Sequence, residues 1–247
     1  ETIIVKNAMT NVRTLDSLVS SGQILSVSST GLKGVNALFW DGSAELDGSF
    51  NITGSDQDDT ITGGSGDDVL SGGAGADTLT AGLGDDTVSG GSDEDTIIFG
   101  PNLTSADTID GGSGTDELRF TDSGLATSDL DGVTNVETVT LGDAATRVTT
   151  VDNLVGNGET LTVTAAALTG ANSLTWDGSA ETDGSFNITG SDQADTITGG
   201  SGDDVLSGGV GADTLTAGAG DDTVSGGADG DTIISEQVEI HLCLART

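Results

Sequence analysis

The sequence predicts an all-β fold, a right-handed parallel β-solenoid or β-roll, and three observations lead to it. Four nonapeptides follow one another without a gap over residues 63–98: GGSGDDVLS, GGAGADTLT, AGLGDDTVS and GGSDEDTII. They return almost unchanged 136 positions later. With 40 glycines and 3% aromatic residues among 247, the chain has too few large side chains for a thick globular core. A short fixed period in such a chain indicates stacked coils.

Each nonapeptide is predicted to form a six-residue turn followed by a three-residue strand. Glycines at the first, second and fourth positions permit the positive φ angles of tight turns. Two nonapeptides then make one coil of 18 residues, so residues 18 apart stack at the spacing of paired strands, about 4.8 Å. The apolar eighth position points into the coil. In the first copy it is occupied by Leu70, Leu79, Val88 and Ile97.

The same stacking brings the sixth-position aspartates together at both edges of the coils. Carboxylates about 5 Å apart repel strongly unless a cation lies between them. Calcium takes six to eight oxygen ligands, and two aspartates with the carbonyls of two glycine-rich turns can supply that shell. A flexible Gly/Asp-rich linker would explain the composition, but not an apolar residue at every ninth position.

We therefore expect several Ca²⁺ ions, each shared by two coils. The expected side-chain ligands are Asp59, Asp68, Asp77, Asp86, Asp95, Asp195, Asp204, Asp213, Asp222 and Asp231, with Asp107 and Asp116 as further candidates where the repeat is weaker. The expected carbonyl ligands belong to Gly64, Gly66, Gly73, Gly75, Gly82, Gly84, Gly200, Gly202, Gly209, Gly211, Gly218 and Gly220. The acids at the fifth position are expected to be solvated surface charge: Asp58, Asp67, Asp85, Asp203 and Asp221.

The pattern G-G-x-G-x-D-x-U-x resembles the calcium-binding nonapeptide of the repeats-in-toxin (RTX) family. The resemblance extends over residues 1–234, and it implies a tandem unit of a large secreted bacterial surface or adhesin-type protein. Some turns depart from the pattern, and we expect weaker calcium binding there. The first glycine is replaced by Ala81 and Ala217, and the fourth by Gln57, Gln193, Asp93 and Asp229.

Two tandem repeats and a tail make up the predicted organisation. Residues 1–50 and 137–186 carry apolar clusters at wider spacing and are expected to form solenoid coils with longer turns, in which residues 15–19 could form one short helical turn. Residues 51–120 and 187–234 are the calcium-binding β-rolls, the first interrupted by a loop around Pro101. Residues 121–136 are a polar connector. Residues 235–247 do not follow the repeat, and we expect a cap or an extension without a role in calcium binding.

Composition excludes several classes of function. A formal net charge of −35 is opposite to that of a nucleic-acid-binding protein and disfavours anionic membranes, and the absence of 18 consecutive apolar residues predicts no membrane insertion. One histidine (His241), one cysteine (Cys243) and no tyrosine cannot assemble a zinc site or a nucleophilic triad, so no enzyme is expected. Without an initiator methionine or signal peptide at Glu1, the chain looks like part of something longer.

The leading hypothesis is an extracellular or cell-surface structural module, a stalk, surface layer or matrix segment, that folds on binding calcium after secretion. Self-association or neighbouring copies in a longer array would suit such a role. One alternative is the carrier region of a type I-secreted toxin or enzyme. Another is an ice-binding solenoid, because Thr60-Ile-Thr62 and Thr78-Leu-Thr80 would form regular rows of threonine.

Overall fold

The computed structural model describes residues 2–6, 10–32, 34–121, 125–126, 128–235 and 241–243. These residues form strands and turns and no helix, which confirms the all-β prediction. Among them there is accordingly no helix that could cross a membrane. Residues 15–19 form a turn in which Leu18 N–H donates to the Leu15 carbonyl at 2.9 Å. Most of the predicted tail, residues 236–240 and 244–247, lies outside the described residues.

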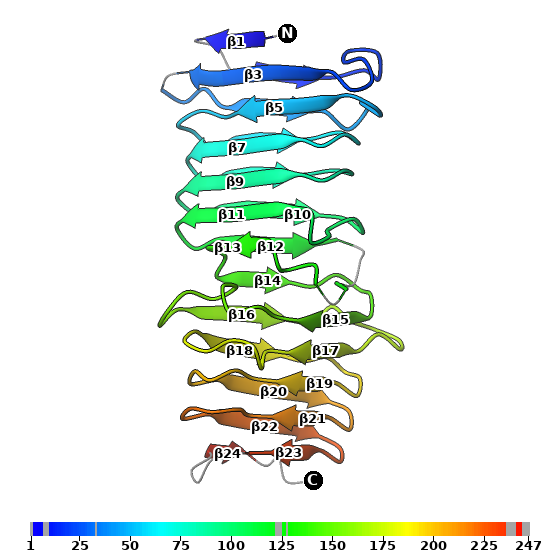
Figure 1. The fold of residues 1–247 in the computed structure, drawn as a ribbon, viewed down its shortest axis with the longest axis vertical. Coiled ribbons are helices and arrows are strands. Elements are labelled where there is room, and N and C mark those ends of the chain that lie inside the picture. Colours follow the sequence, from blue (N-terminus) through cyan, green and yellow to red (C-terminus); the bar gives the residue numbers. More distant parts are fainter. Residues whose placement is uncertain are drawn as a thin grey trace. The chain divides into compact units, whose positions relative to one another are not determined.

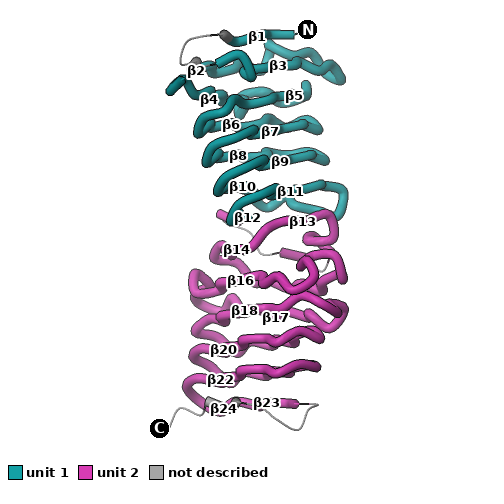
Figure 2. Tube along the Cα trace, turned by 90° about the vertical axis from the view of Figure 1, so that its left-hand side faces the viewer, with its two compact units in different colours: residues 1–118 teal, residues 119–247 magenta. Residues whose placement is uncertain are grey.

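The chain divides into two compact units, residues 1–118 and residues 119–247 (Figure 2). In unit 1 the chain alternates between two parallel sheets, so that each coil adds one strand to each sheet (Figure 1). The first sheet has the order β1 (Thr2–Lys6), β3 (Ile24–Gly31), β5 (Ser49–Thr53), β7 (Val69–Ala74), β9 (Thr87–Ser92) and β11 (Thr108–Ser113). The second has the order β2 (Thr10–Arg13), β4 (Leu38–Asp41), β6 (Thr60–Thr62), β8 (Thr78–Thr80) and β10 (Thr96–Phe99). Strand β12 (Glu117–Phe120) contains the boundary between the units.

Unit 2 is built in the same way, after the short strand β13 (Val133–Thr134). One sheet has the order β14 (Thr138–Thr140), β16 (Thr160–Thr164), β18 (Ser185–Thr189), β20 (Val205–Val210), β22 (Thr223–Ala228) and β24 (His241–Cys243). The other has the order β15 (Thr146–Thr149), β17 (Leu174–Asp177), β19 (Thr196–Thr198), β21 (Thr214–Thr216) and β23 (Thr232–Ile234). Each unit is therefore a parallel β-solenoid, as predicted.

Strand register measures the length of each coil. Thr2 pairs with Ser26 and Ser26 with Asn51, so the first coils are 24 and 25 residues long. Asn51 pairs with Val69 and Val69 with Thr87, which gives the predicted 18. The next coil, which contains the loop around Pro101, is three residues longer: Thr87 pairs with Thr108. The turns tighten on entering the nonapeptides, as expected, and widen again at the interruption.

A thin apolar core runs through each unit. The eighth-position side chains Leu70, Leu79, Val88 and Ile97 are buried and stack on one another through the strand register. Each such side chain contributes about 1.5–3 kcal/mol by leaving water. In the coils with longer turns aromatic pairs fill the wider interior: the rings of Trp40 and Phe50 meet edge to face at 5.4 Å, and those of Trp176 and Phe186 at 5.6 Å.

Candidate metal centre

The sixth-position aspartates lie at the end of each turn, just before the strand, and nearly all of them are buried. Asp59, Asp68, Asp77, Asp86, Asp95, Asp107, Asp116, Asp195, Asp204, Asp213 and Asp222 are at most 3% exposed, and Asp231 is half-buried. Aspartate is almost never fully buried without a partner. Their burial follows from the fold, because the turn above and the turn below cover each carboxylate.

One carboxylate oxygen of each aspartate ties neighbouring coils together. Asp77 Oδ1 accepts from Asp59 N–H at 2.7 Å, and Asp95 Oδ1 accepts from Asp77 N–H at 2.8 Å. At the other edge Asp86 Oδ1 accepts from Asp68 N–H at 2.8 Å. The ladders continue into the longer coil through Asp107 and Asp116, and they recur in unit 2 from Asp195 to Asp213 to Asp231 and from Asp204 to Asp222. The structure thus stacks the aspartates in the two rows that the sequence period indicated.

The second carboxylate oxygen behaves differently along each row. In the first nonapeptide turns it accepts a backbone N–H of its own turn: Asp68 Oδ2 from Gly64 at 2.6 Å, and Asp204 Oδ2 from Gly200 at 2.7 Å. In later turns it is buried without a hydrogen-bond partner, at Asp77, Asp86, Asp95 and Asp213. A buried carboxylate oxygen without a partner is costly. A cation that prefers oxygen ligands is the partner that fits these carboxylate oxygens.

A comparison with known protein families agrees with a cation site formed by carboxylate oxygens. The sequence model of the RTX calcium-binding nonapeptide repeat, which spans four copies, matches residues 51–79, 71–101, 104–120, 187–215 and 198–233. Both units contain RTX calcium-binding repeats. Repeats of this family bind calcium, and the buried aspartates lie within the matched residues. The matches leave out residues 1–50 and 121–186. No curated protein matches the chain.

The turn carbonyls of the RTX repeats point from one coil toward the next. A Cβ added to Gly82 would lie 2.0 Å from the Gly64 carbonyl oxygen, and one added to Gly84 would lie 2.6 Å from that of Gly66. Gly64 O also accepts from Leu83 N–H at 3.0 Å. In unit 2 the carbonyls of Gly200, Gly202 and Gly209 face the next coil in the same way. These glycines are among those predicted to supply carbonyl ligands.

The first-position carbonyls are a further source of oxygen that the sequence reasoning missed. A Cβ on Gly72 would lie 2.1 Å from Asp77 Oδ2 and 2.6 Å from the carbonyl oxygen of Gly90, one coil on. Gly208 stands in the same relation to Asp213 Oδ2 and to the carbonyl of Gly226. The unpartnered carboxylate oxygen and a carbonyl of the next coil therefore lie against the same glycine. The signal was present in the sequence, since the first position is glycine in all but the Ala81 and Ala217 turns.

The departures from the RTX pattern differ in backbone strain. Asp93 and Asp229 have φ angles of 79° and 78°, in the left-handed region that aspartate tolerates better than most residues. Gln57 and Gln193 are not among the non-glycine residues with positive φ. Among these fourth-position residues, only the two aspartates are therefore held at a positive φ angle. All five of the fifth-position aspartates are exposed, as expected.

Burial raises the pKa of several of the stacked carboxylates in the metal-free chain. The pKa of Asp77 rises to about 8 and that of Asp86 to about 7, and the pKa values of Asp68, Asp95, Asp204 and Asp213 rise to about 6. Loss of hydration is the largest cause, backbone hydrogen bonds act against it, and neighbouring carboxylates add to it. Protons and calcium therefore compete for the same oxygens.

Acid is accordingly expected to favour the fold when calcium is absent. The folded chain binds more protons at these carboxylates than the unfolded chain does, since their pKa is near 4 when unfolded. The stabilisation is complete below that value and is lost as the pH rises through about 6 to 8. In chelator, β structure measured by circular dichroism should increase as the pH falls from 8.5 to 5. A loss of β structure on acidification in chelator would contradict this.

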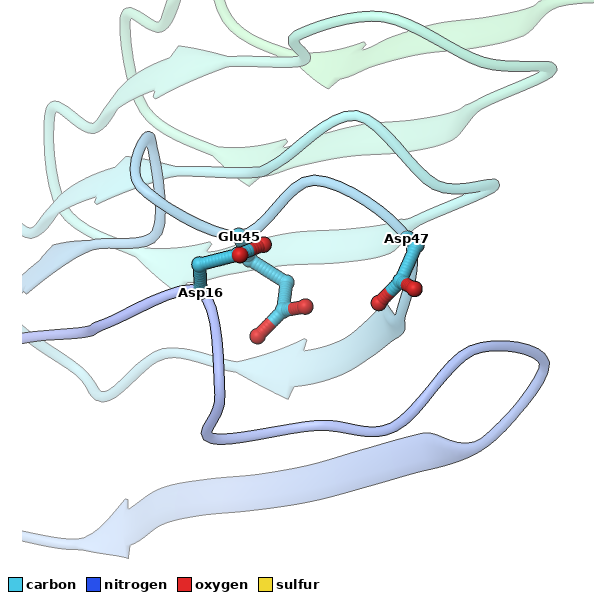
Figure 3. Close-up of side chains that lie close together, drawn as sticks. All are labelled: Asp16, Glu45 and Asp47. Atoms are coloured by element: carbon cyan, nitrogen blue, oxygen red, sulfur yellow. The ribbon is translucent and has the colours of Figure 1, made fainter.

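A second group of acids lies in the coils with longer turns. Carboxylate oxygens of Asp16, Glu45 and Asp47 lie within 4.8 Å of one another (Figure 3), and Asp152, Glu181 and Asp183 repeat the group in unit 2. Glu45 is fully buried, and its carboxylate accepts Val19 N–H at 3.0 Å and Gly48 N–H at 3.2 Å. Its role is to satisfy the backbone of two turns. Sequence reasoning did not single out Glu45 and Glu181, although both follow the segment WDGSA, which is identical in the two copies.

We expect Glu45→Ala to destabilise unit 1 by about 2 kcal/mol in millimolar calcium, because two buried N–H groups lose their acceptor. The matched control is Asp47→Ala, which removes an exposed carboxylate of the same group and should change stability by less than about 0.5 kcal/mol. Denaturant unfolding followed by circular dichroism measures both. Equal losses from the two variants would show that Glu45 does not act as this acceptor.

Proposed function

We propose that the chain is an extracellular structural module whose RTX repeats fold around several Ca²⁺ ions held between successive coils. The observation that carries the proposal is the buried, unpartnered Oδ2 of Asp77, Asp86, Asp95 and Asp213. The side-chain ligands are the sixth-position aspartates of both units, and the turn glycine carbonyls complete the shell. Each inner aspartate serves the ions above and below it, so a filled row is close to electrically neutral.

Affinity in the extracellular range suits such a module. Extracellular calcium modules bind at about 10⁻⁴ to 10⁻³ M. At the far lower free calcium of a cytosol the chain would stay unfolded and able to pass a secretion channel, and it would fold outside. A stalk, surface layer or matrix segment is the role that two near-identical tandem repeats favour. Calorimetric titration tests the site: we expect several ions per chain in that range, and binding of no ion would overturn the proposal.

The alternative of a carrier region for a secreted toxin or enzyme differs in what adjoins the repeats. A carrier would be joined to a separate catalytic domain, whereas a stalk or surface layer would be joined to further copies of the same repeat. The sequence on either side of the repeats in the full-length protein distinguishes the two.

The ice-binding alternative depends on rows of threonine, and the structure contains such rows. Thr60, Thr78 and Thr96 pair in register in unit 1, as do Thr196, Thr214 and Thr232 in unit 2. The neighbouring rows contain only two threonines each, Thr62 and Thr80 in unit 1 and Thr198 and Thr216 in unit 2. These rows end in other residues, at Asp41 and Ile98 in unit 1 and at Asp177 and Ile234 in unit 2. Such short rows offer little regular surface, so we expect no thermal hysteresis from the calcium-loaded protein; a clear hysteresis would favour ice binding.

A further inference from the structure

Turns of two kinds hold the sixth-position aspartates, and they differ at the second position of the nonapeptide. In an open turn the second-position residue has a positive φ angle, and Oδ2 of the aspartate four residues later has no hydrogen-bond partner. Four open turns are formed by Gly73 (φ 119°) with Asp77, Gly82 (116°) with Asp86, Gly91 (124°) with Asp95 and Gly209 (108°) with Asp213. In these turns Oδ2 is available to a cation.

In a closed turn the second-position φ angle is not positive, and the N–H of that residue donates to Oδ2 of the aspartate. Four closed turns are formed by Ser55 with Asp59 at 2.5 Å, Gly64 with Asp68 at 2.6 Å, Ser191 with Asp195 at 2.6 Å and Gly200 with Asp204 at 2.7 Å. These aspartates are the first members of the two rows in each unit. The donated hydrogen and a cation compete for the same oxygen, because both carry positive charge and need its lone pairs.

Glycine and serine differ in how easily a closed turn can open. Glycine adopts a positive φ angle at little cost, so Gly64 and Gly200 can change to the open conformation when calcium binds. A residue with a Cβ rarely adopts that conformation, and Ser55 and Ser191 are buried at 3% and 4% exposure. One row in each unit therefore begins with a turn that resists opening.

The serine hydroxyl adds a second donor to the closed turn. Ser55 Oγ lies 3.0 Å from Asp59 Oδ1 and accepts Gln57 N–H at 3.3 Å, so its own hydrogen is left for the carboxylate. Leu38 N–H donates to the same Oδ1 at 2.5 Å. Three protein donors thus hold the carboxylate of Asp59, and hydrogen bonds to a charged acceptor are the strong ones. The segment TGSDQ is identical in both copies, and the same bonds recur at Ser191, Gln193, Asp195 and Leu174.

A third hydroxyl acts in the same way in the loop around Pro101. Thr104 N–H donates to Asp107 Oδ2 at 2.7 Å, and the Thr104 hydroxyl lies 3.3 Å from the same oxygen. Thr104 Oγ1 also accepts Ala106 N–H at 3.1 Å. A residue with both an N–H and an O–H donor therefore satisfies a row aspartate even where the nonapeptide is interrupted.

We propose that Ser55 and Ser191 cap the first turn of one aspartate row in each unit, so that Asp59 and Asp195 are held by protein donors and do not bind calcium. The ion between the first and second coils of that row is then held by turn carbonyls and by Asp77 or Asp213 alone. It is the weakest ion of the row, because calcium affinity depends on the number of charged ligands. The inference rests on the proposed function and narrows its set of side-chain ligands.

A crystal structure of the full chain grown in millimolar calcium tests the caps, with the ions located by anomalous scattering. We expect an ion within about 2.3–2.6 Å of Oδ2 in Asp77 and Asp213, and none at that distance from Asp59 or Asp195. Asp68 and Asp204 are the internal control, because glycine closes their turns and both should open and bind an ion. Calcium on Asp59 or Asp195 would overturn the inference and leave the proposed function intact. No ion on any row aspartate would overturn the proposed function and this inference with it.

Two variants separate the backbone from the hydroxyl. Ser55→Gly combined with Ser191→Gly removes the hydroxyl and permits a positive φ angle. We expect Asp59 and Asp195 to bind an ion in this variant and the affinity of the first ion of the row to rise about tenfold in calorimetric titration, since one carboxylate is added to its shell. The control, Ser55→Ala combined with Ser191→Ala, removes only the hydroxyl, and we expect its turns to stay closed and its affinity to change less than about threefold. Equal affinities in the glycine and alanine variants would contradict the proposal.

Discussion

Asp77→Asn is expected to weaken calcium binding at two sites at once, by at least tenfold at each, or about 1.4 kcal/mol per site. Asp77 lies in the middle of its row, with Asp59 in the coil before it and Asp95 in the coil after it. Asparagine keeps the Oδ1 that accepts Asp59 N–H, but it replaces the buried, unpartnered Oδ2 by an NH₂ group that cannot bind a cation. Calorimetric titration of the variant measures both the affinity and the number of ions.

Asp67→Asn is the matched control for this change. It removes the same charge from the nonapeptide that precedes that of Asp77, at an exposed fifth position. Asp67 Oδ1 accepts Asp85 N–H at 3.0 Å, and an asparagine oxygen can accept the same bond. We expect a change in affinity of less than about threefold, since an exposed charge is largely screened. Equal effects of the two variants would mean that the ligand position within the nonapeptide has been misassigned.

Removal of calcium is expected to unfold both units, and its return to refold them cooperatively. Each ordered residue loses roughly 1–2 kcal/mol of backbone entropy. The thin core and the stacked, buried carboxylates recover little of it without metal. Ions that bind only the folded form and share ligands between coils should couple the folding of successive coils.

Tryptophan emission can follow each unit separately. Trp40 is buried in unit 1 and Trp176 in unit 2, and they are the two tryptophans of the chain. In the variants Trp176→Phe and Trp40→Phe, the remaining tryptophan should shift to shorter wavelength on addition of calcium with a Hill coefficient above one. A Hill coefficient of one in both variants would contradict coupling between sites.

The periodic features of the fold were predictable from the sequence. The register of Leu70 on Val88 and of Leu79 on Ile97 follows from a period of nine, because two nonapeptides close one coil. The stacking of Asp59, Asp77 and Asp95 follows from the same period. These features depend on local turn chemistry that is repeated with a fixed period and few departures, so no long-range information was needed.

Other features depend on contacts that no local pattern encodes. Whether Asp Oδ2 accepts an N–H of its own turn, as at Asp68, or is left without a partner, as at Asp77, depends on the turn conformation. The burial of Glu45 depends on Val19, 26 residues earlier in the chain. The division into compact units falls after Leu118 and not at the repeat boundary at residue 136, and within unit 2 the Leu125 carbonyl accepts Arg147 N–H of β15.

The most direct test of calcium-dependent folding is far-ultraviolet circular dichroism with small-angle scattering of the full chain at pH 7.5, first in chelator and then in millimolar calcium. The account predicts an expanded chain with little β signal in chelator, and a compact chain with strong β signal once calcium is added. Magnesium at the same concentration should not substitute, because it demands a smaller octahedral shell and gives up its waters reluctantly. Strong β signal and compact dimensions in chelator would contradict the account, and would make the repeats a scaffold that is folded with or without calcium.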